Sequence, residues 1–118
     1  MLKDKALRSL EAGDLLLARG FPNDAATRYY YSMFRAAVHA LTQMGKRPGA
    51  MRSGAVEWDH SMVRNNLGLL RRPLTDRILY EAMRKMRVIA DYKDGDVDAA
   101  LLRRLRPAVG NFVTDLAR

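Results

Sequence analysis

Apolar residues recur every three or four positions along most of the chain, which is the spacing of helices that bury one face. The strongest run extends from Ala26 to Met44. Its apolar seam consists of Ala26, Tyr30, Met33, Ala37, Leu41 and Met44. Because the flanks of this run are apolar as well, we expect it to form the central helix. No stretch alternates with a period of two, so we expect no sheet.

Four further segments carry the same spacing and predict helices. They are Leu2–Arg19, Asp59–Leu70, Asp76–Ala90 and Val97–Ala117. The residues expected to face inward are Ala6, Leu10, Gly13 and Leu17, then Val63, Leu67 and Leu70, then Leu79, Met83, Met86 and Ala90, and finally Leu101, Leu105, Ala108, Phe112 and Leu116. Pro107 is expected to kink or split the last segment near Arg103, because proline removes a helical hydrogen bond. The chain is therefore predicted to be one all-α domain over residues 1–118, an antiparallel up-and-down bundle of four to five helices.

Glycine, proline and acidic residues mark where these helices should begin and end. Gly20 suits the position just after the first helix and Pro22 can open the second, so that GFPND forms a short connection. The stretch GKRPGAMRSG, residues 45–54, is predicted to be an exposed loop. The residues expected to cap or precede later helices are Asp59 or Ser61, Thr75, Asp96 and Asp98.

The composition is that of an ordinary globular domain. The chain has 118 residues, of which 48% are hydrophobic and 29% charged, and it contains no cysteine. Disulfides and thiolate metal sites are therefore excluded, and a cytoplasmic location is expected. No apolar run approaches the roughly 20 residues that cross a bilayer, and the charged N-terminus lacks the apolar core of a signal peptide, so we expect no membrane association.

The net charge is +8 and the isoelectric point is about 10.3. Such an excess favours polyanionic partners, namely nucleic acid, nucleotides or acidic protein surfaces. The alternative is that arginines spread over nearly every segment only keep the domain in solution. Charge alone does not decide between the two, so the positions of individual arginines matter more.

Most common catalytic and cofactor signatures are missing from the sequence. The two histidines, His39 and His60, lie in different predicted helices and form no pair with metal-ligand spacing, so no metal site is expected. No glycine-rich phosphate loop occurs, and DYKDGD, residues 91–96, lacks the full ligand set of a calcium loop. A helix face shared by Ser32 and His39 is weak grounds for nucleophilic catalysis. We expect no cofactor.

A polar stripe runs along the otherwise apolar second helix. Its members are Arg28, Ser32, Arg35, His39 and Thr42. Such a stripe faces either bulk solvent or a polar cleft shared with another helix or subunit. The neighbouring Tyr29 and Tyr31 are expected on the flanks of the helix, with their rings packed and their hydroxyls in water.

The predicted fourth helix ends in RVIADY, residues 87–92. Arg87 and Asp91 are four positions apart, so they can form an ion pair on one helix face, and Tyr92 follows directly. Spacing alone therefore indicates a salt bridge at the end of a helix, followed by a tyrosine in a loop.

Three motifs, in their order along the chain, resemble the HEPN family of small all-α prokaryotic domains. Residues 29–37, YYYSMFRAA, resemble the family's YYxMFxAA second helix, His60 would open the third helix, and RVIADY resembles an RxxADY end of the fourth. The resemblance covers nearly the whole chain. It implies a helical bundle that often forms homodimers, and commonly a small nucleotidyltransferase as the partner chain in a toxin–antitoxin pair.

The resemblance also implies a function and its residues. Active members are metal-independent ribonucleases in which a histidine follows an arginine by four to six residues, but here Tyr92 stands five residues after Arg87. A phenol is a poor base at neutral pH, so we expect a catalytically weak or inactive module that binds a nucleotide or an RNA phosphate. In this hypothesis Arg87 holds the phosphate, Asp91 orients Arg87 and Tyr92 donates its hydroxyl. The expected binding residues are Arg87, Asp91, Tyr92, Arg35, Arg28 and His39.

Two other functions remain open at this point. A ribonuclease toxin would combine Arg87 with His60 or His39, because an imidazole can move a proton near neutral pH, and the candidate catalytic residues are then Arg87 and His60. A helical protein–protein adaptor is the third interpretation. The absence of a repeated hairpin counts against it.

Overall fold

All regular elements in the described part of the chain are helical. The computed structural model describes residues 1–49, 57–92 and 94–118. Its elements are α1 (Leu2–Ala18), α2 (Pro22–Gln43), α3 (His60–Asn66), the 3₁₀ turn η1 (Leu67–Leu70), α4 (Leu74–Tyr92) and α5 (Ala99–Leu116). No strand occurs in these ranges, so the prediction of an all-α helical bundle is confirmed.

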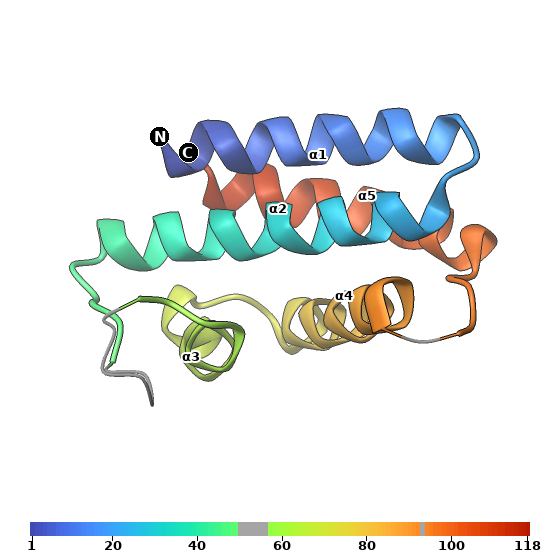
Figure 1. Cartoon of the computed structure of the whole chain (residues 1–118). Helices are drawn as coiled ribbons and strands as arrows, with labels where there is room; N and C mark the ends of the chain where they lie inside the picture. Colours follow the sequence, from blue (N-terminus) through green and yellow to red (C-terminus); the bar gives the residue numbers. More distant parts are fainter. Residues whose placement is uncertain (50–56, 93) are drawn as a thin grey trace.

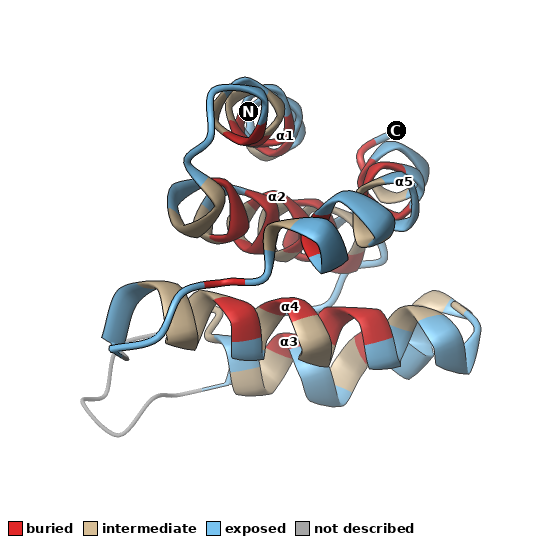
Figure 2. Ribbon diagram, turned by 90° about the vertical axis from the view of Figure 1, so that its right-hand side faces the viewer, coloured by how far each residue is buried: buried red, intermediate tan, exposed pale blue. Residues whose placement is uncertain are grey.

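The central element is α2, which contacts each of the other helices. The axes of α1, α2 and α5 are roughly aligned, with α1 antiparallel to the other two (Figure 1). The two ends of the chain lie at the same end of the molecule (Figure 1). α3 and α4 lie on the opposite side of α2 from α1. Two views turned by 90° show that α4 crosses α2 steeply (Figure 1, Figure 2). The bundle thus combines an antiparallel α1–α2 hairpin with a crossing second layer.

A glycine and a proline set the sharp connection between α1 and α2. Gly20 has a φ of +86°, a conformation that glycine adopts without steric strain. The Phe21 N–H then donates to the Leu16 carbonyl at 2.9 Å, which closes the end of α1. Pro22 is the first residue of α2, where its missing N–H is not needed. α2 therefore begins earlier than the predicted Ala26, and the connection is shorter than GFPND.

The core is built around α2. Its buried residues are Ala25, Ala26, Tyr29, Tyr30, Ser32, Met33, Ala36, Ala37, Val38 and Leu41. The predicted seam is confirmed except at Met44, which lies at the C-cap and is exposed. For Tyr29, the predicted packing of the ring is confirmed, since the ring is fully buried against Gly13 of α1. The predicted contact of its hydroxyl with water is wrong, because the hydroxyl donates to Asp14.

The inward face of α5 is displaced from the predicted one. Its buried residues are Leu102, Val109, Gly110, Phe112 and Val113. Leu101 and Ala108 were expected inside but are exposed. Apolar residues occupy both sides of this helix, so their spacing alone does not show which side is buried. α5 also continues through Pro107 without a break; this proline is exposed, so the lost hydrogen bond faces water.

Two of the predicted helix caps are confirmed and one is wrong. The Asp59 carboxylate accepts a hydrogen bond from the N–H three residues later at 2.9 Å, and Asp98 accepts from the first two N–H groups beyond Ala99. Thr75 is not a cap, because α4 already begins at Leu74. Residues 46–49 of the predicted loop are non-helical, and residues 50–54 lie outside the described ranges. No described helix is both long and apolar enough to cross a membrane.

Candidate anion-binding site

Arg87 lies near the end of α4 with its guanidinium group among three tyrosine rings. Its Cζ atom lies 5.3 Å from the ring centroid of Tyr31, 5.4 Å from that of Tyr92 and 5.9 Å from that of Tyr30. The Arg87 side chain is only 18% exposed. An aromatic face attracts a cation at such distances, and more strongly where water is excluded. We call Arg87, Asp91 and these three tyrosines the Arg87 cluster.

The polar neighbours of Arg87 leave part of its donor capacity free. Nε lies 3.2 Å from Asp91 Oδ2 as an ion pair without a hydrogen bond, and Nη2 donates to the Tyr92 hydroxyl at 3.4 Å. Thr27 Oγ1 donates to Asp91 Oδ1 at 2.9 Å, which ties the end of α4 to α2. A guanidinium carries five N–H groups. Within the described residues Tyr92 is its one hydrogen-bond acceptor, so donors remain for an added anion.

Arg35 brings a second guanidinium to the cluster from α2. Its Nη1 donates to Ser9 Oγ of α1 at 2.6 Å, and its Cζ lies 5.6 Å from the Tyr31 centroid. Tyr31 therefore packs against two cations, which concentrates positive charge at one place on the surface. Arg28 is exposed on the same helix and forms no hydrogen bond or ion pair with any described residue.

His39 and His60 lie apart from the Arg87 cluster. His39 is eight residues beyond Tyr31 on α2, which corresponds to about 12 Å along the helix axis. His60 is exposed at the first position of α3. Figure 1 shows α3 beside the C-terminal half of α2, whereas the end of α4 is tied to the N-terminal half through Thr27. The structure thus brings together four of the six expected binding residues, Arg35, Arg87, Asp91 and Tyr92.

A second polar cluster, which the sequence analysis did not predict, joins α1, α2 and α5. Arg106 Nε and Nη2 donate to the two carboxylate oxygens of Asp14 at 2.7 and 2.6 Å, and the Tyr29 hydroxyl donates to Asp14 Oδ1 at 2.5 Å. The Arg106 hydrogen bonds hold the pKa of Asp14 below its usual value, while burial and the Asp14 carboxylate raise the pKa of Tyr29. The sequence contains no specific signal for this cluster, because Arg106 is one of three arginines between the buried Leu102 and Val109. Because these groups satisfy one another, we assign the cluster to stability.

Comparisons with known proteins do not add to this description. No family model matches the sequence, and a search of curated proteins found no match either. In the described ranges, no group of three or more His, Asp or Glu side chains is placed to hold a metal ion. The chemistry of the candidate site therefore follows from its guanidinium, phenol and carboxylate groups.

Proposed function

We propose that this chain is a HEPN-like module that binds a nucleotide or an RNA phosphate and has weak or no catalytic activity. The observation that carries the proposal is the position of the Arg87 guanidinium among three tyrosine rings, with N–H donors to spare. Charge attraction is stronger where water is displaced, and a guanidinium matches the geometry of phosphate oxygens. Arg35 adds a second cation at Tyr31, and the net charge of +8 adds long-range attraction.

Single-stranded RNA is the ligand that suits the Arg87 cluster best. Tyr92 is 69% exposed, so its ring offers a face on which a base can stack while Arg87 holds the adjacent phosphate. Stacking of a base on an aromatic side chain contributes about 1–3 kcal/mol. Arg28 extends the basic surface along α2, and Asp91 keeps Arg87 in position through its own bond to Thr27.

Weak or absent catalysis fits the groups that surround Arg87. They are phenols and one carboxylate, whereas the two imidazoles of the ribonuclease alternative lie elsewhere in the chain. General acid–base catalysis requires the proton-transfer group within hydrogen-bond reach of the reacting atom. A ribonuclease built on Arg87 would therefore need His39 or His60 from a second copy of the chain.

A homodimer is part of the proposal, and the outer face of α4 supports it. Leu74 and Ile78 are 64% and 61% exposed, and they line a hollow of about 440 Å³ together with Glu81 and Lys85. A surface that carries apolar groups and both signs of charge can pair with itself about a two-fold axis. A small nucleotidyltransferase partner and a role in a prokaryotic toxin–antitoxin pair rest on the family resemblance. A cytoplasmic location is proposed because the chain contains no cysteine.

The binding of a fluorescein-labelled single-stranded RNA, measured by fluorescence anisotropy at several salt concentrations, tests the proposed function. Arg87→Ala should weaken binding about tenfold, because a charge-assisted hydrogen bond is lost, and should also reduce the salt dependence. Tyr92→Ala should weaken binding while leaving the salt dependence unchanged, since stacking releases no counterions. Arg104→Ala removes the same charge from an exposed position on α5 and serves as the control. Equal weakening by Arg87→Ala and Arg104→Ala would contradict a specific site.

Gel analysis of the same RNA after incubation separates binding from cleavage. We expect intact RNA at protein concentrations that saturate binding. Cleavage that disappears in both Arg87→Ala and His60→Ala would favour the ribonuclease alternative instead. RNA binding that is absent in the unmodified protein would remove the proposal and leave the adaptor interpretation.

A further inference from the structure

A second hollow lies away from the Arg87 cluster, where the C-terminal ends of α2 and α5 meet the turn η1. Its volume is about 400 Å³, a size at which small-molecule sites begin. Half of the residues that line it are apolar, namely Ala40, Met44, Leu69, Leu70 and Leu116. Its charged or titratable side chains are His39, Arg71, Asp115 and Arg118. An apolar wall with a cationic rim suits a ligand that has both an apolar body and an anionic head.

Arg71 reaches this rim through an unusual backbone conformation. It follows η1 with φ 54° and ψ 31°, and in the described ranges it is the one non-glycine residue with a positive φ. An L residue in this region costs about 1–2 kcal/mol, which glycine would avoid while making the same turn. The Arg71 side chain is exposed and forms no ion pair with any described residue. Strain of this kind is often retained at binding sites, and here its effect is to hold an unpaired guanidinium at the rim.

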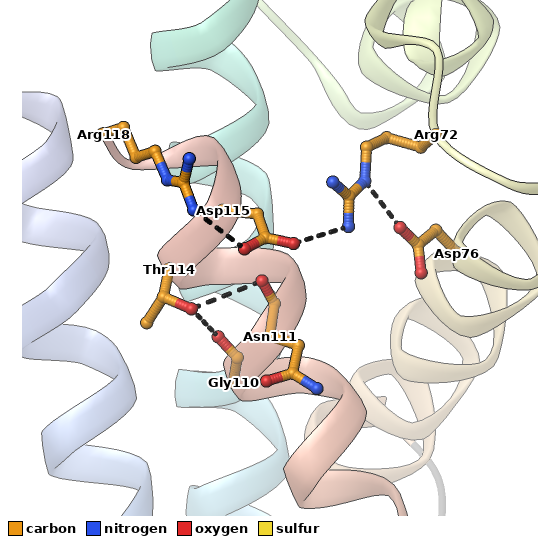
Figure 3. Close-up of polar contacts among 7 residues, drawn as sticks. All are labelled: Arg72, Asp76, Gly110, Asn111, Thr114, Asp115 and Arg118. Atoms are coloured by element: carbon orange, nitrogen blue, oxygen red, sulfur yellow. Dashed lines mark hydrogen bonds and ion pairs between the residues drawn. The ribbon is translucent and has the colours of Figure 1, made fainter.

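The other charged groups of the hollow are already engaged. Asp115 Oδ2 lies 3.1 Å from Arg72 Nη2, and its Oδ1 lies 3.8 Å from Arg118 Nη2, so two arginines approach one carboxylate from opposite sides (Figure 3). His39 Nε2 lies 3.0 Å from the main-chain oxygen of Arg118, which joins α2 to the end of α5. Among the lining arginine and aspartate side chains, two positive charges and one negative charge leave a single positive charge. One negative charge on the ligand balances this positive charge. A doubly charged phosphate would carry one negative charge too many and would be repelled by Asp115.

We propose that this hollow binds a small carboxylate with a linear apolar body. The carboxylate accepts two parallel N–H···O hydrogen bonds from the Arg71 guanidinium, the geometry in which arginine binds carboxylates. The apolar body lies against Leu69 and Leu116, where it covers Leu69, an exposed leucine. This site is independent of the proposed RNA function, because it shares no residue with the Arg87 cluster.

Titration of ¹⁵N-labelled protein with sodium octanoate, followed by two-dimensional NMR, tests the inference. Amide shifts should change around residues 39–44, 69–71 and 115–118 and should saturate. Octanol, which has the same body without the charge, and acetate, which has the charge without the body, should each bind more weakly than octanoate. Octanol binding as tight as octanoate, shifts centred on Leu74 and Ile78 of α4, or no saturable shift at all would each overturn the proposal.

Arg71→Gly is the decisive variant, because glycine keeps the left-handed turn while the guanidinium is removed. We expect octanoate to bind about three- to fivefold more weakly, the upper part of the range for an exposed ion pair. Arg8→Ala, at an exposed position on α1, lowers the net charge equally and should leave octanoate affinity unchanged. Leu69→Ser should weaken octanoate and leave acetate unaffected. An equal loss in Arg71→Gly and Arg8→Ala would show a non-specific charge effect and overturn the site.

Discussion

The ionisation of Asp14 depends directly on the fold. Its carboxylate accepts hydrogen bonds from Arg106 of α5 and from Tyr29 of α2. The Arg106 hydrogen bonds favour the charged form, so the pKa of Asp14 in the folded protein lies below the ordinary value of 3.8 that applies in the unfolded chain. A lowered carboxyl pKa adds stability above the unfolded value, and that stability is lost as the pH falls through the folded value.

Asp14→Asn should therefore destabilise the protein at pH 7 and much less in acid. We expect a loss of about 1 kcal/mol at neutral pH, since the site is partly exposed and solvent screens the charges. Urea denaturation of both proteins at pH 7 and at pH values below 3.8 measures the difference. Asp94→Asn, in the exposed connection between α4 and α5, is the control and should show little change at either pH. A loss for Asp14→Asn that is the same at both pH values would contradict the electrostatic explanation.

At the Arg87 cluster, sequence reasoning recovers the groups on α4 and the adjacent Arg35, but it does not predict the contacts with the tyrosine rings from α2. Arg87 and Asp91 are four residues apart, so helical geometry alone predicts their ion pair, which the structure contains at 3.2 Å. The contacts of Arg87 with Tyr30 and Tyr31 depend on how α4 crosses α2. The spacing of residues within one helix does not determine how two helices cross. The tyrosine rings around Arg87 can therefore be identified only from the packed structure.

Among the elements, the α1–α2 hairpin has a close helix contact that depends on a single residue. A Cβ atom added to Gly13 of α1 would lie 2.7 and 2.8 Å from Cε1 and Cδ1 of the Tyr29 ring. The ring has no room to withdraw, because Tyr29 is fully buried and its hydroxyl is held by Asp14. Glycine is therefore required here for packing, although it lowers helix propensity by about 1 kcal/mol relative to alanine.

Gly13→Ala should destabilise the protein although alanine is the better helix former. Overpacking typically costs about 1–3 kcal/mol, which exceeds the gain in helix propensity, so we expect a net loss of about 1 kcal/mol. Thermal denaturation followed by circular dichroism measures this as a lower Tm. Gly68→Ala in η1 is the matched control, since a Cβ there meets nothing within 4 Å and should be tolerated. A higher Tm for Gly13→Ala would show that α1 and α2 separate without cost.

The elements also show where a periodic pattern is sufficient and where it is not. On α1, the predicted inward residues are all buried, because the opposite side is mainly polar, with Leu15 as an exposed exception. On α5, Leu101 and Leu102 are neighbours and both apolar, so the period is clear but the buried side is not. Arg106 adds to this ambiguity, since it lies beside the buried side and is retained there by its ion pair with Asp14.

In the molecule as a whole, the core contains several buried tyrosines, whose hydroxyl groups are removed from water. Tyr29, Tyr30 and Tyr80 are all buried, and the hydroxyls of Tyr30 and Tyr80 lie 3.2 Å apart in the core between α2 and α4. Burial raises the pKa of each of the three above its ordinary value of 10.0. The second layer of the fold is thus joined to α2 partly through hydroxyl groups that must stay protonated.

This arrangement predicts that the protein loses stability in alkaline solution. A tyrosine with a raised folded pKa contributes fully below the unfolded value of 10.0 and destabilises the fold as the pH rises above it, because only the unfolded chain releases the proton. The fall in net positive charge toward the isoelectric point of about 10.3 acts in the opposite direction, but it relieves only weak, screened repulsion between surface charges. Burial of the hydroxyls should therefore have the larger effect on the free energy of unfolding.

Urea denaturation between pH 8 and pH 11 should show a steep decline in the unfolding free energy above pH 10. Tyr80→Phe, which removes one ionisable group, should make this decline shallower. A stability that is level across this range would mean that these hydroxyls ionise without unfolding, and that the core between α2 and α4 is open to water.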